Sequence, residues 1–264
     1  MKKVITIILS LVFILVTCGQ KENNKELTIG TSPGPYSELF IKHIKPQLEK
    51  EGFKVKTKDF TDLQQADVAL NEGQIDVNVD QHKAYMDTFN KEKEGKLVAV
   101  QKIPTVPAQI FSKKHKNLNV KQGAEIAIPN DPSNAARAYR LLEKAGWIKL
   151  EAKKDDIKIS DKNIVSNPHQ LNIKQMDSAN IPRILDEVDY AVIPGSIVHA
   201  SKVDTKLALL KEDLVDQLYL QVVVNQKNEH KPWVKAIKKA YHSKVFKESL
   251  DKENTDQKWI VPKD

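Results

Sequence analysis

Apolar and polar positions along the chain follow the pattern of strands that alternate with helices. Residues 27–30 have the pattern of a short buried strand, and residues 36–51 carry apolar side chains at helical spacing, ending at Gly52. The same rhythm continues, with strands expected at 53–57, 75–79, 97–103, 108–112, 125–128, 173–175 and 190–193 and helices at 62–72, 84–92, 132–145 and 179–185. Such alternation predicts an α/β fold with largely parallel sheets.

A repeated pattern suggests that the chain forms two lobes. Residues 69–79 and 184–193 both have the pattern of a helix end, a tight turn, an aspartate and a buried strand. Polar or turn residues follow each strand, at 80–82 and at 194–196. Ligands of open α/β sheets bind beyond the carboxyl ends of the strands, so we expect both segments to face one cleft. Chance similarity over so short a stretch is the alternative.

The segment 128–138 carries the strongest signal for binding. Asp131 is suited to cap the helix that follows, and Ser133 and Asn134 place amide donors at its N-terminus, where the helix dipole favours an anion. Arg137 lies one turn beyond Asn134 on the same face. Guanidinium and amides together suit a ligand carboxylate. The alternative is an arginine on a solvated helix face, which we expect for Arg140.

Asp80, Gln81, His82 and Tyr85 form a second candidate cluster. Asp80 and His82 share one face of the expected strand, an arrangement compatible with catalysis or metal binding. The chain has no G-x-S-x-G motif, and its other histidines do not stand at metal-ligand spacing. We therefore expect no catalytic residue and no metal ligand. His82 is either a structural residue at the strand end or, with Tyr85, part of a pocket wall.

The N-terminus has the pattern of an export signal. Lys2 and Lys3 precede an apolar run at 4–16, which is shorter than the ~20 residues needed to span a bilayer. The run ends at Cys18, the single cysteine of the chain, and a polar segment follows. One cysteine excludes an internal disulfide. The remaining explanations are a lipid attachment site and an ordinary secreted protein with a buried cysteine.

Composition narrows the possible partners. The chain has 264 residues with a formal net charge of +7, and 40% of them are hydrophobic, enough for a packed core. Basic residues are dispersed and almost all are lysine, the arginines being Arg137, Arg140 and Arg183. A nucleic-acid surface is richer in arginine and more clustered, so we exclude a nucleic-acid partner.

Several motifs together resemble one family. They are the segments 30–36, 60–62, 73–76, 81–85, 111–114, 128–134 and 141–146. In this order they are similar to the NlpA/MetQ family, lipoproteins that act as the substrate-binding components of methionine-type ABC importers, and the resemblance runs from residue 27 to residue 262. The segment around Cys18 likewise resembles a lipobox, in which the cysteine becomes the acylated first residue of the mature protein. Thr17 departs from that pattern, which usually has Gly, Ala or Ser.

The resemblance implies a type II periplasmic-binding-protein-like fold of two α/β lobes with a cleft between them. It implies two crossing strands, at 107–112 and 220–225. The expected division is a signal peptide at 1–17, a lipidated tether at 18–26, a first lobe from 27–108 with 225–264, and a second lobe at 109–224.

The resemblance also implies a function without catalysis or cofactor. The protein is expected to be lipid-anchored on the extracytoplasmic face of the cell membrane, to capture methionine or a related amino acid or short peptide, and to deliver it to an ABC permease. Family members bind the amino-acid carboxylate at the positions of Arg137 and Asn134 and line the side-chain slot at the positions of His82 and Tyr85.

Four positions depart from the family pattern. Leu63 and Asp80 stand where an aromatic residue is usual, and Pro194 and Gln221 each replace an asparagine. Pro194 has no side-chain amide to hold an ammonium group, so we expect Asp80 to accept it, with Gln221 also at the ligand. Asp80 facing solvent or capping a helix is the alternative. At the level of function, the alternative is a surface lipoprotein with an altered pocket that acts through macromolecular contacts.

Overall fold

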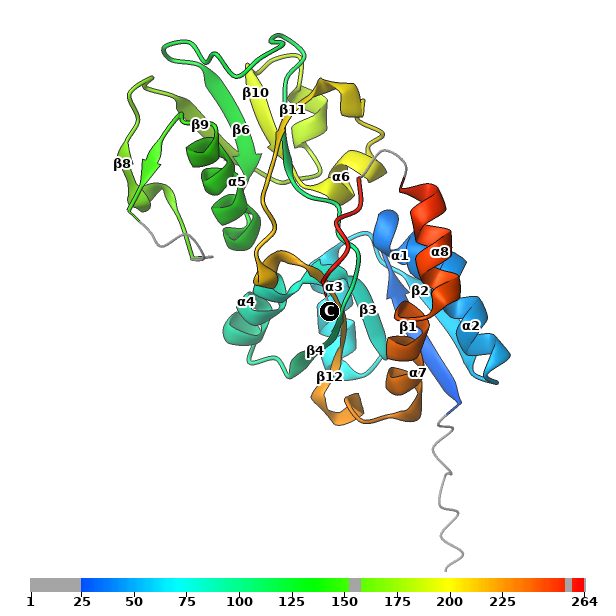
Figure 1. Ribbon diagram of the computed structural model, residues 1–264. Helices are drawn as coiled ribbons and strands as arrows, with labels where there is room; N and C mark the ends of the chain where they lie inside the picture. The colour runs from blue at the N-terminus through cyan, green and yellow to red at the C-terminus, as the bar shows by residue number, and fades with distance from the viewer. Residues whose placement is uncertain (1–24, 152–157, 255–257, 264) are drawn as a thin grey trace, which may run out of the picture.

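The computed structural model describes residues 25–151, 158–254 and 258–263, which form two lobes (Figure 1). The expected signal segment and Cys18 lie outside these residues. Each lobe is built on a mixed five-stranded sheet, with strand order β2-β1-β3-β12-β4 in lobe 1 and β11-β5-β10-β6-β9 in lobe 2. Within the described residues no helix is long and apolar enough to cross a membrane.

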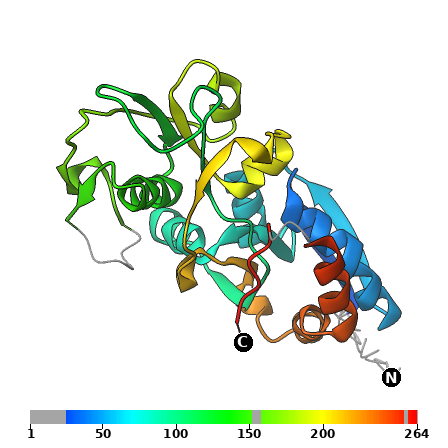
Figure 2. The ribbon, with the colours of Figure 1, turned by 45° about the horizontal axis from the view of Figure 1, so that its top comes forward.

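Lobe 1 contains both the beginning and the end of the described chain. Its strands are β1 (Glu26–Thr31), β2 (Lys54–Asp59), β3 (Val77–His82), β4 (Leu97–Lys102) and β12 (Leu220–Asn225). One face of the sheet is covered by α1 (Pro35–Leu39), the π-helical turn η1 (Phe40–Ile44), α2 (Lys45–Lys50), α7 (Pro232–Tyr241) and α8 (Lys244–Glu253), as Figure 2 shows. The other face packs against α3 (Leu63–Glu72) and α4 (Lys83–Lys93). A short 3-10 turn, η6 (Gln226–Asn228), follows β12.

Lobe 2 is one continuous stretch of chain. Its sheet contains β5 (Gln109–Phe111), β6 (Glu125–Pro129), β9 (Asn172–Met176), β10 (Tyr190–Ile193) and β11 (Ala208–Lys211). The helices are α5 (Pro132–Lys144), α6 (Gly195–Ala200) and the 3-10 turns η2 (Asp161–Asn163), η3 (Ile181–Ile184) and η4 (Thr205–Leu207). β7 (Lys149–Leu150) and β8 (Ile164–Ser166) form a separate antiparallel pair. Fully buried Tyr139, Leu142 and Trp147 anchor α5 and the turn after it in the core of lobe 2.

Two segments carry the chain between the lobes. The first crossing segment, residues 103–108, joins β4 to β5, and the second, residues 212–219, joins β11 to β12 and contains the 3-10 turn η5 (Asp216–Leu218). The C-terminal stretch runs beside the first, because the backbones of Thr105 and Ile260 exchange hydrogen bonds of 3.0 and 2.8 Å (Figure 1). The C-terminal stretch therefore packs along the first crossing segment.

The second crossing lies earlier in the chain than the expected strand at 220–225. Those residues form β12, which is inserted antiparallel between β3 and β4 of lobe 1. Val222, Val223 and Val224 are fully buried there, so this apolar run forms the centre of a sheet and not an open connection. Lobe 1 thus takes up the chain again at Leu220, before the expected boundary at 225.

Two further expectations were wrong in detail. The sheets are mixed and not largely parallel, because β12, β4, β5 and β11 all pair antiparallel. The helix expected at 179–185 is only the 3-10 turn η3. Ile181, Leu185 and Val188 are buried in this region, but turns present them to the sheet and no regular helix forms.

Candidate functional site

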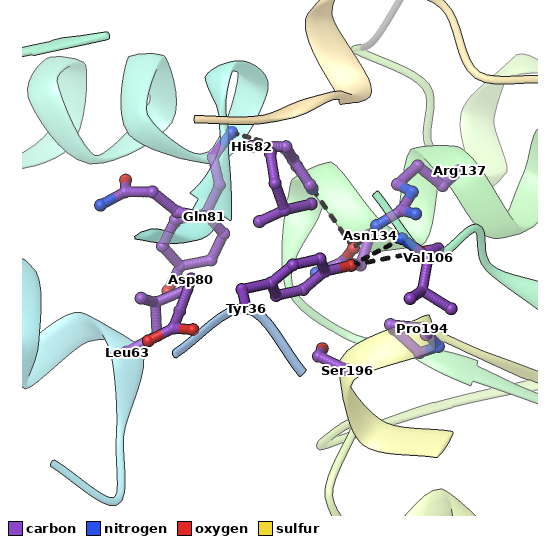
Figure 3. A pocket seen from close by; sticks show the side chains of 13 residues that line it. Tyr36, Leu63, Asp80, Gln81, His82, Val106, Asn134, Arg137, Pro194 and Ser196 are labelled. Carbon is purple, nitrogen blue, oxygen red and sulfur yellow. Dashed lines mark hydrogen bonds between the residues drawn. The ribbon is translucent and has the colours of Figure 1, made fainter. Parts of the chain in front are cut away.

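A small pocket lies between the lobes where the crossing segments meet them. Its volume is about 60 Å³. Lobe 1 and the crossing region contribute Tyr36, Leu63, Asp80, Gln81, His82, Tyr85, Val106 and Leu220, and lobe 2 contributes Asn134, Arg137, Pro194, Gly195 and Ser196 (Figure 3). Residues 80–82 and 194–196 thus line one cleft, as their repeated pattern predicted.

A bulge in β3 brings three consecutive residues, Asp80, Gln81 and His82, to the lining of the pocket. Gln81 pairs with Gln221 and Asn78 with Val223, so three steps along β3 face two along β12. The Asn78 side chain fills the extra space: its Oδ1 accepts from the Asp80 backbone N–H at 3.0 Å and from Gln81 Nε2 at 3.2 Å. A regular strand would alternate these side chains between its two faces, whereas a bulge re-aims them.

The Asp80 carboxylate is partly satisfied by lobe 1. Its Oδ2 accepts from the Ser37 hydroxyl at 2.7 Å and from the Ser32 backbone N–H at 3.2 Å. Its Oδ1 is shielded from solvent and has no hydrogen-bond partner among the described residues. Burial raises the pKa of Asp80 to about 6, against the opposing effect of the Ser37 and Ser32 hydrogen bonds. At neutral pH the group is therefore ionised, with one oxygen available.

His82 is a neutral hydrogen-bond donor across the cleft. Burial, aided by the nearby Arg137 charge, lowers the pKa of His82 to about 3. Its Nδ1 caps α4 by accepting from the Tyr85 backbone N–H at 3.1 Å. The proton of the neutral ring must then be on Nε2, which lies 3.4 Å from Asn134 Oδ1 in lobe 2. His82 and Asn134 thus connect the two lobes inside the pocket.

At the N-terminus of α5, the amides of Asn134 are used within the helix cap and are not free for a ligand. Asp131 caps the helix, and its Oδ1 accepts from the Asn134 backbone N–H at 3.0 Å. The Asn134 side-chain amide also donates to both carboxylate oxygens of Asp131, at 3.1 Å each. The Asn134 amide groups are therefore committed to Asp131, and its Oδ1 holds His82 and Arg137.

Arg137 is the buried cation of the pocket. It is 5% exposed, and its Nη1 donates to Asn134 Oδ1 at 2.8 Å, the contact that their helical spacing predicted. Its Nε donates to Glu212 Oε2 at 3.0 Å, and its Nη2 donates to Glu212 Oε1. Of the five N–H groups of a guanidinium, one on Nη1 and one on Nη2 remain without an acceptor among the described residues. By contrast, Arg140 pairs with Glu143 on the same helix, away from the pocket.

Tyr36 joins lobe 1 to the first crossing segment. Its hydroxyl accepts from the Val106 backbone N–H at 3.1 Å and donates to the Val106 carbonyl at 3.3 Å. Its ring packs edge-on against Trp259 of the C-terminal stretch, with 5.7 Å between centroids. Gly195 approaches the same point from lobe 2, where a Cβ would lie 2.6 Å from the Val106 carbonyl oxygen. Only a glycine allows this closeness of α6 and the crossing segment.

The structure brings most of the sequence-predicted site residues together. Asp80, His82, Tyr85, Asn134 and Arg137 all line the pocket. Gln221 does not: it is buried in β12, and its side chain donates to the Tyr219 carbonyl at 3.2 Å.

The sequence analysis missed Tyr36 and Glu212. Tyr36 follows the Pro-Gly-Pro loop at the end of β1, a position beyond a strand end that could have marked it. Glu212 carries no local signal, because its partner Arg137 is 75 residues away.

Asp67 lies fully buried behind the pocket wall. It belongs to α3, and its Oδ1 accepts from Gln81 Nε2. Burial raises the pKa of Asp67 to about 8, and the charge of Asp80 acts in the same direction. Asp67 is therefore largely protonated at neutral pH. No group of three or more His, Cys, Asp or Glu residues within the described ranges is arranged to hold a metal ion.

Comparison with known proteins agrees with this architecture. A protein of Pasteurella multocida named probable D-methionine-binding lipoprotein MetQ is 34% identical over 235 residues, which cover 88% of this chain and 84% of the relative. The solved structure of a nutrient-binding protein from Burkholderia cenocepacia bound to methionine has a TM-score of 0.82 and 36% identity, covering 90% of this chain and all of that one. The substrate-binding protein of a methionine transporter from Streptococcus pneumoniae has a TM-score of 0.80 and 28% identity, covering 90% and 96%.

Two α/β lobes with a pocket between them, beside their crossing segments, define the class of two-lobe substrate-binding proteins. The model of the NlpA lipoprotein family matches residues 27–262. The chain belongs to the NlpA lipoprotein family.

The raised pKa of Asp67 predicts a pH-dependent stability. The unfolded chain releases this proton near the ordinary pKa of 3.8, whereas the folded protein keeps it up to about 8. The stabilising contribution of protonated Asp67 to the unfolding free energy is thus fully present below about pH 4 and is lost as the pH rises through about 8. Asp67→Asn should flatten the fall in unfolding free energy between pH 6 and 8, by up to about 1.4 kcal/mol per pH unit. Denaturant titrations at several pH values measure this.

Asp186→Asn is the control for that series, because Asp186 is 72% exposed in its pair with Lys113. It should leave the pH profile unchanged. A wild-type slope retained in Asp67→Asn would mean that Asp67 is ionised throughout.

Proposed function

We propose that this protein is the substrate-binding component of an ABC importer and that it captures methionine, or a related amino acid or short peptide, between its lobes. The observation that carries the proposal is the buried Arg137 in the pocket wall, with an N–H on each of two nitrogens still available. Two parallel N–H groups are what a carboxylate accepts most strongly.

The opposite charge of a zwitterion has a partner in lobe 1. Asp80 lines the pocket, has one shielded oxygen without a hydrogen-bond partner among the described residues, and is mostly ionised at neutral pH. An unpaired buried carboxylate is costly, so closure of the lobes should favour a ligand that brings an ammonium group to it. Leu63, Tyr85 and Leu220 supply apolar surface for the ligand's side chain.

The names of the relatives support this ligand class. They include D-methionine-binding lipoproteins and a protein solved with methionine bound. The alternative of a surface lipoprotein with an altered pocket is not favoured, because the pocket residues His82, Asn134 and Arg137 form one connected network with Glu212. We propose binding without catalysis, in which both nitrogens of His82 serve to cap α4 and to contact Asn134.

Calorimetry with D- and L-methionine, other amino acids and methionine dipeptides tests the function, and Arg137→Ala tests the site. Loss of the carboxylate's partner should weaken binding of the best ligand by about 2–5 kcal/mol, roughly thirtyfold or more. Arg140→Ala is the control from the same helix and should bind normally. If Arg137→Ala stays folded and binds within about tenfold of wild type, Arg137 does not hold the carboxylate.

Asp80→Asn tests the ammonium contact, because it keeps the shape of the side chain and removes its charge. Affinity for the amino-bearing ligand should fall about tenfold at neutral pH, whereas affinity for its N-acetylated analogue should hardly change. If both ligands lose affinity equally, or neither does, Asp80 has only a structural role, in which it accepts hydrogen bonds from Ser32 and Ser37.

We also propose that Cys18 is acylated and anchors the protein on the extracytoplasmic face of the membrane, beside its permease. The resemblance to a lipobox and membership of a lipoprotein family support this. Cys18→Ser should release the protein from the membrane fraction, because each acyl chain contributes about 0.8 kcal/mol per buried CH₂. Undiminished retention after fractionation would contradict acylation at this residue.

A further inference from the structure

Glu212 stands at the point where the two crossing segments enter lobe 2. It is the first residue of the second crossing segment, and it is 6% exposed. Its backbone N–H donates to the Ala108 carbonyl at 3.0 Å, and its Oε1 accepts from the Ala108 backbone N–H at 2.6 Å. Ala108 ends the first crossing segment, so backbone and side chain of Glu212 both bind the other connection.

The same carboxylate holds one edge of the Arg137 guanidinium. Its two oxygens take the Nε–H and one N–H of Nη2, and both side chains are only 5% exposed. A bidentate pair of this kind fixes the plane of the guanidinium as well as its charge. Arg137 therefore cannot rotate freely, and its remaining N–H groups keep one direction.

We infer that Glu212 is a positioning residue for ligand recognition. It orients the guanidinium of Arg137 so that its free N–H groups face the pocket, and it links that guanidinium to both crossing segments. This inference rests on the proposed function, in which Arg137 receives the ligand's carboxylate. Glu212 itself is not among the residues that line the pocket.

Neutralisation of charge is the second part of this role. An arginine buried without a partner in an empty pocket would destabilise the folded protein, because its charge would lose its hydration. Glu212 supplies the compensating negative charge before any ligand binds. Burial, the largest single influence, would lower the pKa of Arg137, yet the charge and hydrogen bonds of Glu212, together with smaller effects of Tyr36 and Asp131, raise the pKa above its ordinary value. The ligand's carboxylate then meets a guanidinium that is already charged and oriented.

The pair Arg140–Glu143 offers a matched control on the same helix. Arg140 Nη1 donates to Glu143 Oε2 at 2.7 Å, but both side chains are partly exposed and neither lines the pocket. Loss of that carboxylate changes the same kind of interaction without touching Arg137.

Binding measurements on Glu212→Gln, Glu212→Asp and Glu143→Gln, each with methionine and methioninamide, test the inference. Glu212→Gln places an amide donor against the guanidinium, so methionine should bind about tenfold more weakly while methioninamide, which lacks the carboxylate, changes less than about threefold. Glu212→Asp keeps the charge and should recover part of the loss. Glu143→Gln should match wild type. Equal losses for both ligands, or none, would overturn the inference.

A second measurement does not depend on the ligand. The chain has only three arginines, so their Nε–H signals are few in a proton–nitrogen spectrum, and Arg137→Lys identifies the one from Arg137. In wild type this signal should exchange slowly with water, and in Glu212→Gln it should exchange at least about tenfold faster. An unchanged exchange rate in Glu212→Gln would overturn the positioning role, whether or not the wild-type protein binds methionine. A wild-type protein that binds no methionine would refute the proposed function but not the positioning of Arg137 by Glu212.

Discussion

A guanidinium can be buried between two lobes only if a carboxylate is buried with it, and much of this structure follows from that requirement. Glu212 satisfies Arg137 and at the same time binds Ala108, so the buried positive charge of the pocket is attached to the backbone that joins the lobes. From Arg137 the contacts continue through Asn134 to His82 in lobe 1. A single polar chain thus runs from the crossing segments across the cleft.

The lobe 1 side of the pocket depends on an irregularity in its sheet. The bulge at Asn78 brings Asp80, Gln81 and His82 to one site, although neighbours in a regular strand point to opposite faces. Behind them, protonated Asp67 accepts from Gln81, so a second carboxyl group can be buried near Asp80 without a second negative charge. The net charge on this side of the pocket therefore depends on which carboxyl group is protonated as well as on which residues are present.

The sequence predicted the parts of the fold and site that depend on local patterns. Strand and helix periodicity located nearly every element of both sheets, and the spacing of Asn134 and Arg137 predicted their contact. Glu212 was beyond such arguments, since its contacts span 75 and 104 residues. Gln221 was misplaced because an apolar strand shows the same periodicity in a crossing segment and in the centre of a sheet. Local periodicity can locate a strand in the sequence, but which strands pair with it depends on the whole fold.

The insertion of β12 between β3 and β4 has a consequence for the order in which the protein can fold. Residues 109–211 of lobe 2 are contiguous, so that lobe can acquire its sheet as soon as this stretch has been synthesised. Lobe 1 cannot, because β4 pairs with no strand other than β12 in the described sheet, and β12 arrives more than a hundred residues later. Contacts of such long sequence separation form slowly. Until then, the unpaired backbone edges of β3 and β4 lie open to aggregation.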